Sequence, residues 1–180
     1  MNRRRLSPSK QLTLGAMVTA LTILSLYAVA VLPFGSIPLY FFASFCIYVL
    51  ACEGAYTAAM ISFLASAALG FFLLPDKSPV LAYVALLGHF GIFRTALQGR
   101  VQSKVFLMLI KLLYCDLFAG AGLYLGIYVW GGLNFTLPEG LPVWAVVVLS
   151  QLVFLAYDIL YAISTGIYEA RFRRSIVPRR

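Results

Sequence analysis

The chain has 180 residues, of which 62% are hydrophobic and 11% are charged, and its formal net charge is +8. Soluble domains carry about 25% charged residues, so this composition excludes an ordinary soluble globular protein. The basic residues gather at the two ends and in one middle segment, which is typical of a membrane-orientation signal rather than of a nucleic-acid-binding surface.

Long apolar runs follow one another along the chain, and they are continuous rather than alternating. Continuous runs favour helices over a β-barrel, and in lipid each helix satisfies its own backbone polar groups. One crossing needs about 20 apolar residues. We therefore expect an all-α polytopic bundle of six transmembrane helices, forming a single integral membrane domain over residues 1–180. The expected helices cover residues 12–32, 37–52, 55–74, 80–96, 105–130 and 143–168.

The second and third expected helices come from one unbroken apolar stretch, residues 37–74. At about 1.5 Å per residue this stretch is far too long for a single crossing. Glu53 and Gly54 are its natural break. The segment 75–79 begins and ends with proline and predicts a turn before the fourth helix, and residues 131–142 form the longest predicted loop.

Lys and Arg are distributed unevenly over the predicted loops. With six crossings, both termini, the turn at Glu53 and the segment 97–104 share one side of the membrane. That side holds the basic N-terminus, the C-terminal arginines, Arg100 and Lys104, whereas the opposite side holds only Lys77. Basic loops stay in the cytoplasm, so we expect a multi-pass protein of the cell membrane with both termini cytoplasmic.

Motifs for the common catalytic chemistries are absent from the sequence. It has no phosphate-binding loop and no GxGxxG, HExxH or GxSxG motif. A single His, together with three Cys that lack CxxC spacing, excludes most metal sites. We therefore expect a protein that is not an enzyme and that holds no cofactor or metal, so that any transport would draw energy from a partner or an ion gradient.

Several ionisable residues lie inside the predicted helices, where such residues usually face the bundle interior, a cavity or a partner. His89 lies in the fourth helix and Asp116 at mid-depth in the fifth. One interpretation is a polar cluster that binds a substrate or relays protons. The other is structural: Lys111 and Arg94 extend to the inner surface, and Asp116 or Asp158 pairs with one of them.

Aromatic residues gather at the predicted outer ends of the last two helices. Tyr128 and Trp130 end the fifth helix, and Trp144 starts the sixth. They form either an interfacial aromatic belt or a cap over an outward-facing pocket. In the second case Asn134 and Glu139 of the intervening loop would supply polar contacts.

The first predicted helix carries small residues at its cytoplasmic end, with Ala16 and Ala20 four positions apart. This spacing lets another helix approach closely. The basic N-terminus followed by LTLGAMVTAL (residues 12–21) resembles the opening of the substrate-binding S components of energy-coupling factor (ECF) transporters. The stretch PFGSIPLY (residues 33–40), Gly54 and the small residues of the third helix resemble the same family.

The resemblance implies a membrane-embedded subunit that binds a vitamin or a similar small molecule and assembles with a transmembrane coupling subunit and two ATPase subunits. It also implies that Ala16 and Ala20 dock on the coupling subunit. Residues from the polar and aromatic features above are candidates for substrate binding: His89, Asp116, Tyr128, Trp130, Asn134, Glu139 and Trp144.

Two other functions fit the same layout. One is a non-transporting membrane scaffold similar to the MreD type, in which the helices only assemble partners. The other is a small ion-coupled carrier or intramembrane enzyme that uses His89, Asp116 and Asp158. A small molecule that copurifies with the protein would favour the importer subunit over the scaffold.

Overall fold

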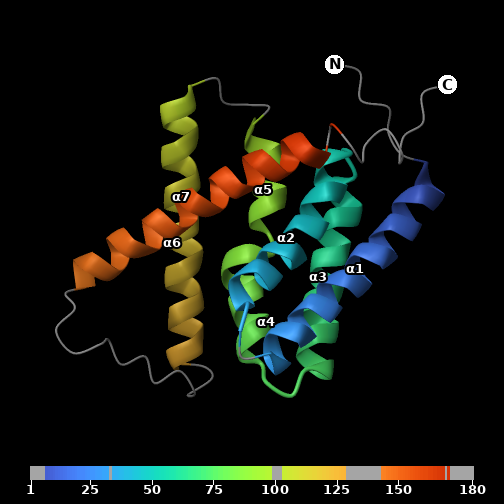
Figure 1. The fold of residues 1–180 in the computed structure, drawn as a ribbon, viewed down its shortest axis with the longest axis horizontal. Helices are drawn as coiled ribbons and strands as arrows, with labels where there is room; N and C mark the ends of the chain where they lie inside the picture. The colour runs from blue at the N-terminus through green and yellow to red at the C-terminus, as the bar shows by residue number, and fades with distance from the viewer. Residues whose placement is uncertain (1–6, 33, 99–102, 129–142, 169, 171–180) are drawn as a thin grey trace. The chain divides into compact units, whose positions relative to one another are not determined.

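The computed structural model describes residues 7–32, 34–98, 103–128, 143–168 and 170. Over these ranges the secondary structure is helical, without strands, which confirms the predicted all-α class (Figure 1). The helices are α1 (Pro8–Val31), α2 (Ser36–Cys52), α3 (Tyr56–Leu73), α4 (Ser78–Ala82), the π-helical η1 (Tyr83–Leu87), α5 (Phe90–Gln98), α6 (Lys104–Tyr128) and α7 (Val143–Ile167).

Five helical stretches of the described chain are long and apolar enough to cross a membrane: Pro8–Val31, Tyr56–Leu73, Ser78–Leu97, Val105–Gly122 and Ser150–Ile167. Helix α2 is also apolar but has 17 residues. The protein therefore has the helices of a multi-pass membrane protein. The sixth crossing and the cytoplasmic location of both termini stay predictions.

The chain forms two compact units, of which the first, Met1–Phe135, holds α1 to α6 and the second, Thr136–Arg180, holds α7. Within the first unit α1 packs against both α2 and α3, and α2 packs against α5 (Figure 1). Within the second unit the rings of Tyr157 and Tyr161, one helical turn apart on α7, lie 5.2 Å from each other.

The turn between α2 and α3 lies at the predicted break. Gly54 has a φ of 77°, a left-handed conformation that glycine adopts without steric cost. The N–H of Gly54 donates to the carbonyl of Ala51 at 3.0 Å, and the N–H of Ala55 donates to the carbonyl of Leu50 at 3.1 Å. These two bonds form a Schellman motif, which ends α2 and lets α3 begin within a few residues.

Helix α1 begins at Pro8, four residues before the predicted start. Proline suits the first turn of a helix because that turn does not need its N–H. The N–H of Gln11 donates to the carbonyl of Ser7 at 3.0 Å and closes this turn. The prediction was short because it followed apolar residues, whereas the helix continues through the polar residues that precede them.

The fourth predicted helix is not continuous. Its middle is the π-helical segment η1, in which the N–H of Gly88 donates to the carbonyl of Tyr83, five residues earlier, at 2.7 Å. The Ser44 hydroxyl of α2 donates to the carbonyl of Leu87. The apolar run predicted an unbroken helix over residues 80–96, and the structure corrects this prediction at η1.

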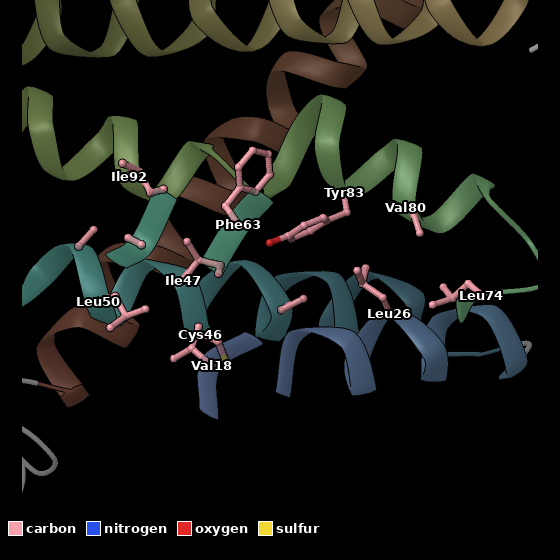
Figure 2. Close-up of a cluster of buried hydrophobic side chains, with 13 residues drawn as sticks. Val18, Leu26, Cys46, Ile47, Leu50, Phe63, Leu74, Val80, Tyr83 and Ile92 are labelled. Atoms are coloured by element: carbon pink, nitrogen blue, oxygen red, sulfur yellow. The ribbon is translucent and has the colours of Figure 1, made fainter. Parts of the chain in front are cut away.

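The core of the first unit is formed by apolar side chains from α1, α2, α3, η1 and α5 (Figure 2). Leu26 and Ile47 are fully covered, and the rings of Phe63 and Tyr83 lie 5.7 Å apart near its centre. The hydroxyl of Tyr83 lies 3.1 Å from the hydroxyl of Ser66, so the polar atom of this buried ring has a hydrogen-bonding partner.

Candidate functional site

A groove with a volume of about 630 Å³ opens between α1 and α3, and we refer to it as the α1–α3 groove. Ala16 and Ala20, the two residues predicted to dock a partner helix, both line it, and both are exposed. The structure therefore brings the predicted docking residues into one concave surface. The lining consists of Pro8, Gln11, Leu12, Gly15, Ala16, Thr19, Ala20, Ile23, Thr57, Ala58, Ile61, Ser62, Ala65 and Leu69.

The floor of the α1–α3 groove is held together by a hydrogen bond between the two helices. The carbonyl of Gly15 on α1 accepts from the Ser62 hydroxyl of α3 at 3.2 Å and from the Thr19 hydroxyl at 2.8 Å. A Cβ on Gly15 would lie 3.2 Å from the Ser62 hydroxyl oxygen, so glycine permits this close approach. The groove is thus a preformed surface rather than a gap between loosely packed helices.

The α1–α3 groove is about as long as four turns of a helix. Its α1 side extends from Pro8 to Ile23, which at about 1.5 Å per residue is a length of about 22 Å, or four helical turns. Large apolar residues, among them Leu12 and Leu69, stand beside the small residues of the floor. Small residues at such a surface let another membrane helix approach closely.

A second region lies between α6 and the segment that runs from η1 into α5. Ala85, His89 and Phe93 are spaced four residues apart, and they lie opposite three residues of α6 that have the same spacing. We call this row of contacts the His89 seam. The pairs are Ala85 with Gly122, His89 with Phe118, and Phe93 with Tyr114. A Cβ on Gly122 would lie less than 3.0 Å from that of Ala85, so the two helices are closest at this end.

His89 lies at the middle of the seam among aromatic rings. The ring centroids of His89 and Phe118 are 4.1 Å apart, and the two planes meet at 74°. Tyr114 lies at 5.3 Å and Phe63 at 6.0 Å from the imidazole centroid. Both imidazole nitrogens are buried, and neither has a hydrogen-bonding partner in the part of the chain that the structure describes. A buried polar group without a partner is uncommon in proteins and calls for a physical explanation.

Asp116 does not join His89. It lies two residues from both Tyr114 and Phe118 on α6, and two residues of an α-helix correspond to a rotation of about 200°. Asp116 therefore lies on the opposite side of α6 from the seam, where it is partly buried. Asp158 belongs to α7 in the second unit. The structure thus does not bring together His89 and Asp116, the two intrahelical ionisable residues expected to bind substrate.

The structural interpretation of the sequence expected Arg94 and Lys111 to extend to the inner surface, but the structure buries both side chains. Their side chains are 3% and 6% exposed, so both are covered by protein. The Arg94 guanidinium donates to the Tyr48 hydroxyl at 3.0 Å and lies 5.7 Å from the centroid of the Tyr48 ring. These contacts tie α5 to α2 and give Arg94 a structural role in the bundle.

The remaining predicted substrate-binding residues cannot be placed in either region. Trp130, Asn134 and Glu139 lie outside the described residues, as do the side chains of Tyr128 and Trp144. Both interpretations of the outer aromatic residues therefore stay predictions. Within the described chain, no three His, Cys, Asp or Glu residues are grouped so that they could hold a metal ion.

Comparisons of the chain with protein-family models, with curated proteins and with solved structures found no match. The class of protein therefore rests on the fold: an α-helical membrane protein with a preformed groove on one pair of helices and a partly buried aromatic seam on another. The sequence analysis singled out Ala16 and Ala20, which line the groove, but it did not predict the seam. A signal for the seam was present, since Ala85, His89 and Phe93 share the spacing of Tyr114, Phe118 and Gly122.

Proposed function

We propose that the protein is the membrane-embedded substrate-binding subunit of an ECF-type importer for a vitamin or a similar small molecule. In this proposal the α1–α3 groove docks a helix of a transmembrane coupling subunit, and two partner ATPases supply the energy. The observation that carries the proposal is the groove itself, because the exposed Ala16 and Ala20 line a concave surface about four helical turns long.

The physics of helix association in lipid supports a helix as the occupant of the α1–α3 groove. Lipid tails are as apolar as leucine, so exposed leucines alone do not drive two membrane helices together. Close packing against small residues does, and the groove offers Gly15, Ala16, Ala20 and Ala58 along its floor. The Ser62 bond to Gly15 fixes this floor before a partner arrives, which lowers the entropic cost of docking.

The position of the groove along α1 also supports this partner. The lining begins at Pro8, next to the basic N-terminal segment that we expect in the cytoplasm. Soluble ATPases are reached from the cytoplasm, so a coupling subunit that connects them to this protein must contact it at or near that face. A groove that opens at this end of α1 satisfies the requirement.

The docking test is co-expression of the tagged protein with the coupling subunit and the two ATPases of an ECF transporter from the same genome. The protein should copurify with all three partners. The double variant Ala16→Leu, Ala20→Leu should reduce their recovery at least about tenfold, because leucines fill the floor of the groove. Both residues are exposed, so the variant should keep the melting temperature of the isolated protein.

Ala68→Leu is the matched control. Ala68 is an exposed alanine of α3 that does not line the groove, so the same added bulk should leave recovery unchanged. The docking proposal is wrong if the double variant assembles as well as the wild type, or if Ala68→Leu disrupts assembly equally. Binding of a radiolabelled vitamin to the isolated wild-type protein then distinguishes an importer subunit from a scaffold, which would assemble partners but bind none.

A further inference from the structure

The His89 seam presents a partly buried imidazole whose two nitrogens are covered and have no hydrogen-bonding partner among the described residues. We propose that the seam is a binding site for a planar aromatic molecule that donates a hydrogen bond from an N–H or O–H group to His89. This inference rests on the proposed function and deepens it, since it names the chemical class of the substrate and the residue that would recognise it.

The aromatic neighbours of His89 cannot satisfy it. A neutral imidazole has one N–H donor and one lone pair that accepts. The ring faces of Phe63 and Phe118 accept a hydrogen bond from the imidazole N–H only weakly. The C–H edges of these rings are poor donors and do not satisfy the imidazole lone pair. If this position were only structural, phenylalanine would fill it without leaving a polar atom unmet.

Three hydroxyl groups of the neighbouring helices are engaged elsewhere. Tyr83 shares its hydroxyl with Ser66 at 3.1 Å, and Ser66 also donates to the carbonyl of Phe63 at 2.9 Å. Ser44 donates to the carbonyl of Leu87. These three hydroxyls are therefore directed away from His89, and a ligand or water can supply the donor that His89 lacks among the described residues.

The walls of the seam select an aromatic ring over an aliphatic chain. The rings of Phe93 and Tyr114 are stacked at 3.7 Å and 5°, and Tyr114 lies 4.5 Å from Phe118. Aromatic rings gain from such offset and edge contacts beyond their buried area. Phe63 is buried at the core, whereas Phe118 is partly exposed, so Phe118 is the ring that a ligand can displace from His89.

The backbone beside His89 departs from an ordinary α-helix. The π-helical segment η1 ends at Leu87, and Gly88 follows. A Cβ on Gly88 would lie 2.5 Å from the Phe63 ring and 2.7 Å from the Tyr83 ring, so only glycine fits. Single π-turns inside helices recur at functional sites. Here the π-turn and the glycine place the imidazole against α6, which supports a binding role rather than chance packing.

The test uses the fact that the chain has one histidine. Protein made with ¹⁵N-labelled histidine and purified without partners gives one imidazole signal pair, which reports whether the lone-pair nitrogen accepts a hydrogen bond. Indole and indene are the probes, because they share a planar two-ring shape and only indole has an N–H. Indole should shift the lone-pair nitrogen and bind about tenfold more tightly than indene, a factor expected for one neutral hydrogen bond.

Binding of tritiated indole, corrected for partition into protein-free nanodiscs, extends the test to variants. His89→Phe should remove the preference for indole over indene. Phe106→Leu, which alters an exposed aromatic residue of α6 outside the seam, should not. The comparison of the two probes on the wild type does not depend on how His89→Phe folds.

Three results would overturn the proposal. They are a lone-pair nitrogen that already accepts a hydrogen bond from water in the ligand-free protein, equal binding of indole and indene, and no shift with indole. The Ala16→Leu, Ala20→Leu variant should bind indole like the wild type. Failure of docking through the α1–α3 groove and failure of binding at the seam are therefore separate outcomes.

Discussion

Gly122 is the position at which a single methyl group should separate two helices. Its added Cβ would lie less than 3.0 Å from the Cβ of Ala85 in η1, and the next atom that it meets is the Ala85 backbone. A Cβ cannot rotate away as the end of a long side chain can. The variant Gly122→Ala therefore has to move α6 away from η1.

The size of the effect follows from the contact distances. Carbon atoms pack best at about 3.5–4.0 Å, so the two helices must move apart by about 1 Å. The stacked pair of Phe93 and Tyr114, now at 3.7 Å, and the contact of His89 with Phe118, now at 4.1 Å, both loosen. Overpacking of this kind costs about 1–3 kcal/mol, and we expect about 2 kcal/mol.

Gly120→Ala is the matched control, because Gly120 lies on the same helix and nothing lies within 4 Å of its added Cβ. Both variants gain the same helix propensity, about 0.5–1 kcal/mol, so their difference isolates the clash. Reversible unfolding in mixed micelles with increasing SDS measures it. Equal unfolding free energies for the two variants would refute the close contact, as would a Gly122→Ala protein more stable than Gly120→Ala.

Three further predictions concern the fold, each measured by the same unfolding experiment. Gly54→Ala should cost about 1 kcal/mol because its φ of 77° disfavours a side chain, and a neutral result would contradict the Schellman turn. Ser62→Ala should cost about 0.6 kcal/mol through the lost bond to Gly15, with stabilisation as the contrary outcome. Tyr48→Phe should cost about 1–3 kcal/mol because the buried Arg94 loses its 3.0 Å partner, and no change would show that this bond is dispensable.

The sequence was sufficient for the all-helical class and for the break between α2 and α3. Hydropathy finds spans because lipid leaves few alternatives to a helix. Gly54 could be predicted as a turn because only glycine adopts its backbone conformation without strain, and it follows the single acidic residue of a long apolar run. Both signals are local, so they need no knowledge of which helices touch.

The π-turn at η1 could not be predicted in the same way. Nothing within residues 83–87 breaks a helix, since the segment YVALL has neither glycine nor proline. What accompanies the π-turn is tertiary: the Ser44 hydroxyl on the carbonyl of Leu87, and the rings that press on Gly88. A local pattern carries no information about a donor that lies 43 residues away in the chain.

The α1–α3 groove and the His89 seam also differ in whether a local sequence pattern can predict them. Ala16 and Ala20 could be chosen from the sequence because a groove on a membrane helix requires small residues at that spacing. The partners of His89 could not, because the pairing of η1 and α5 with α6 depends on how three helices meet. The sequence grouped His89 with Asp116 by charge, whereas the structure groups His89 with aromatic rings.

Helix α3 contacts both regions through two consecutive residues. Ser62 donates to Gly15 in the floor of the α1–α3 groove, and Phe63 lies 6.0 Å from His89 and 5.7 Å from Tyr83. A partner helix that shifts α3 at Ser62 necessarily moves Phe63, because adjacent residues of one helix move together. Any such shift changes the space beside His89. By thermodynamic linkage, a ligand in the seam would then change the affinity of the groove for its partner by the same factor that the partner changes the affinity for the ligand.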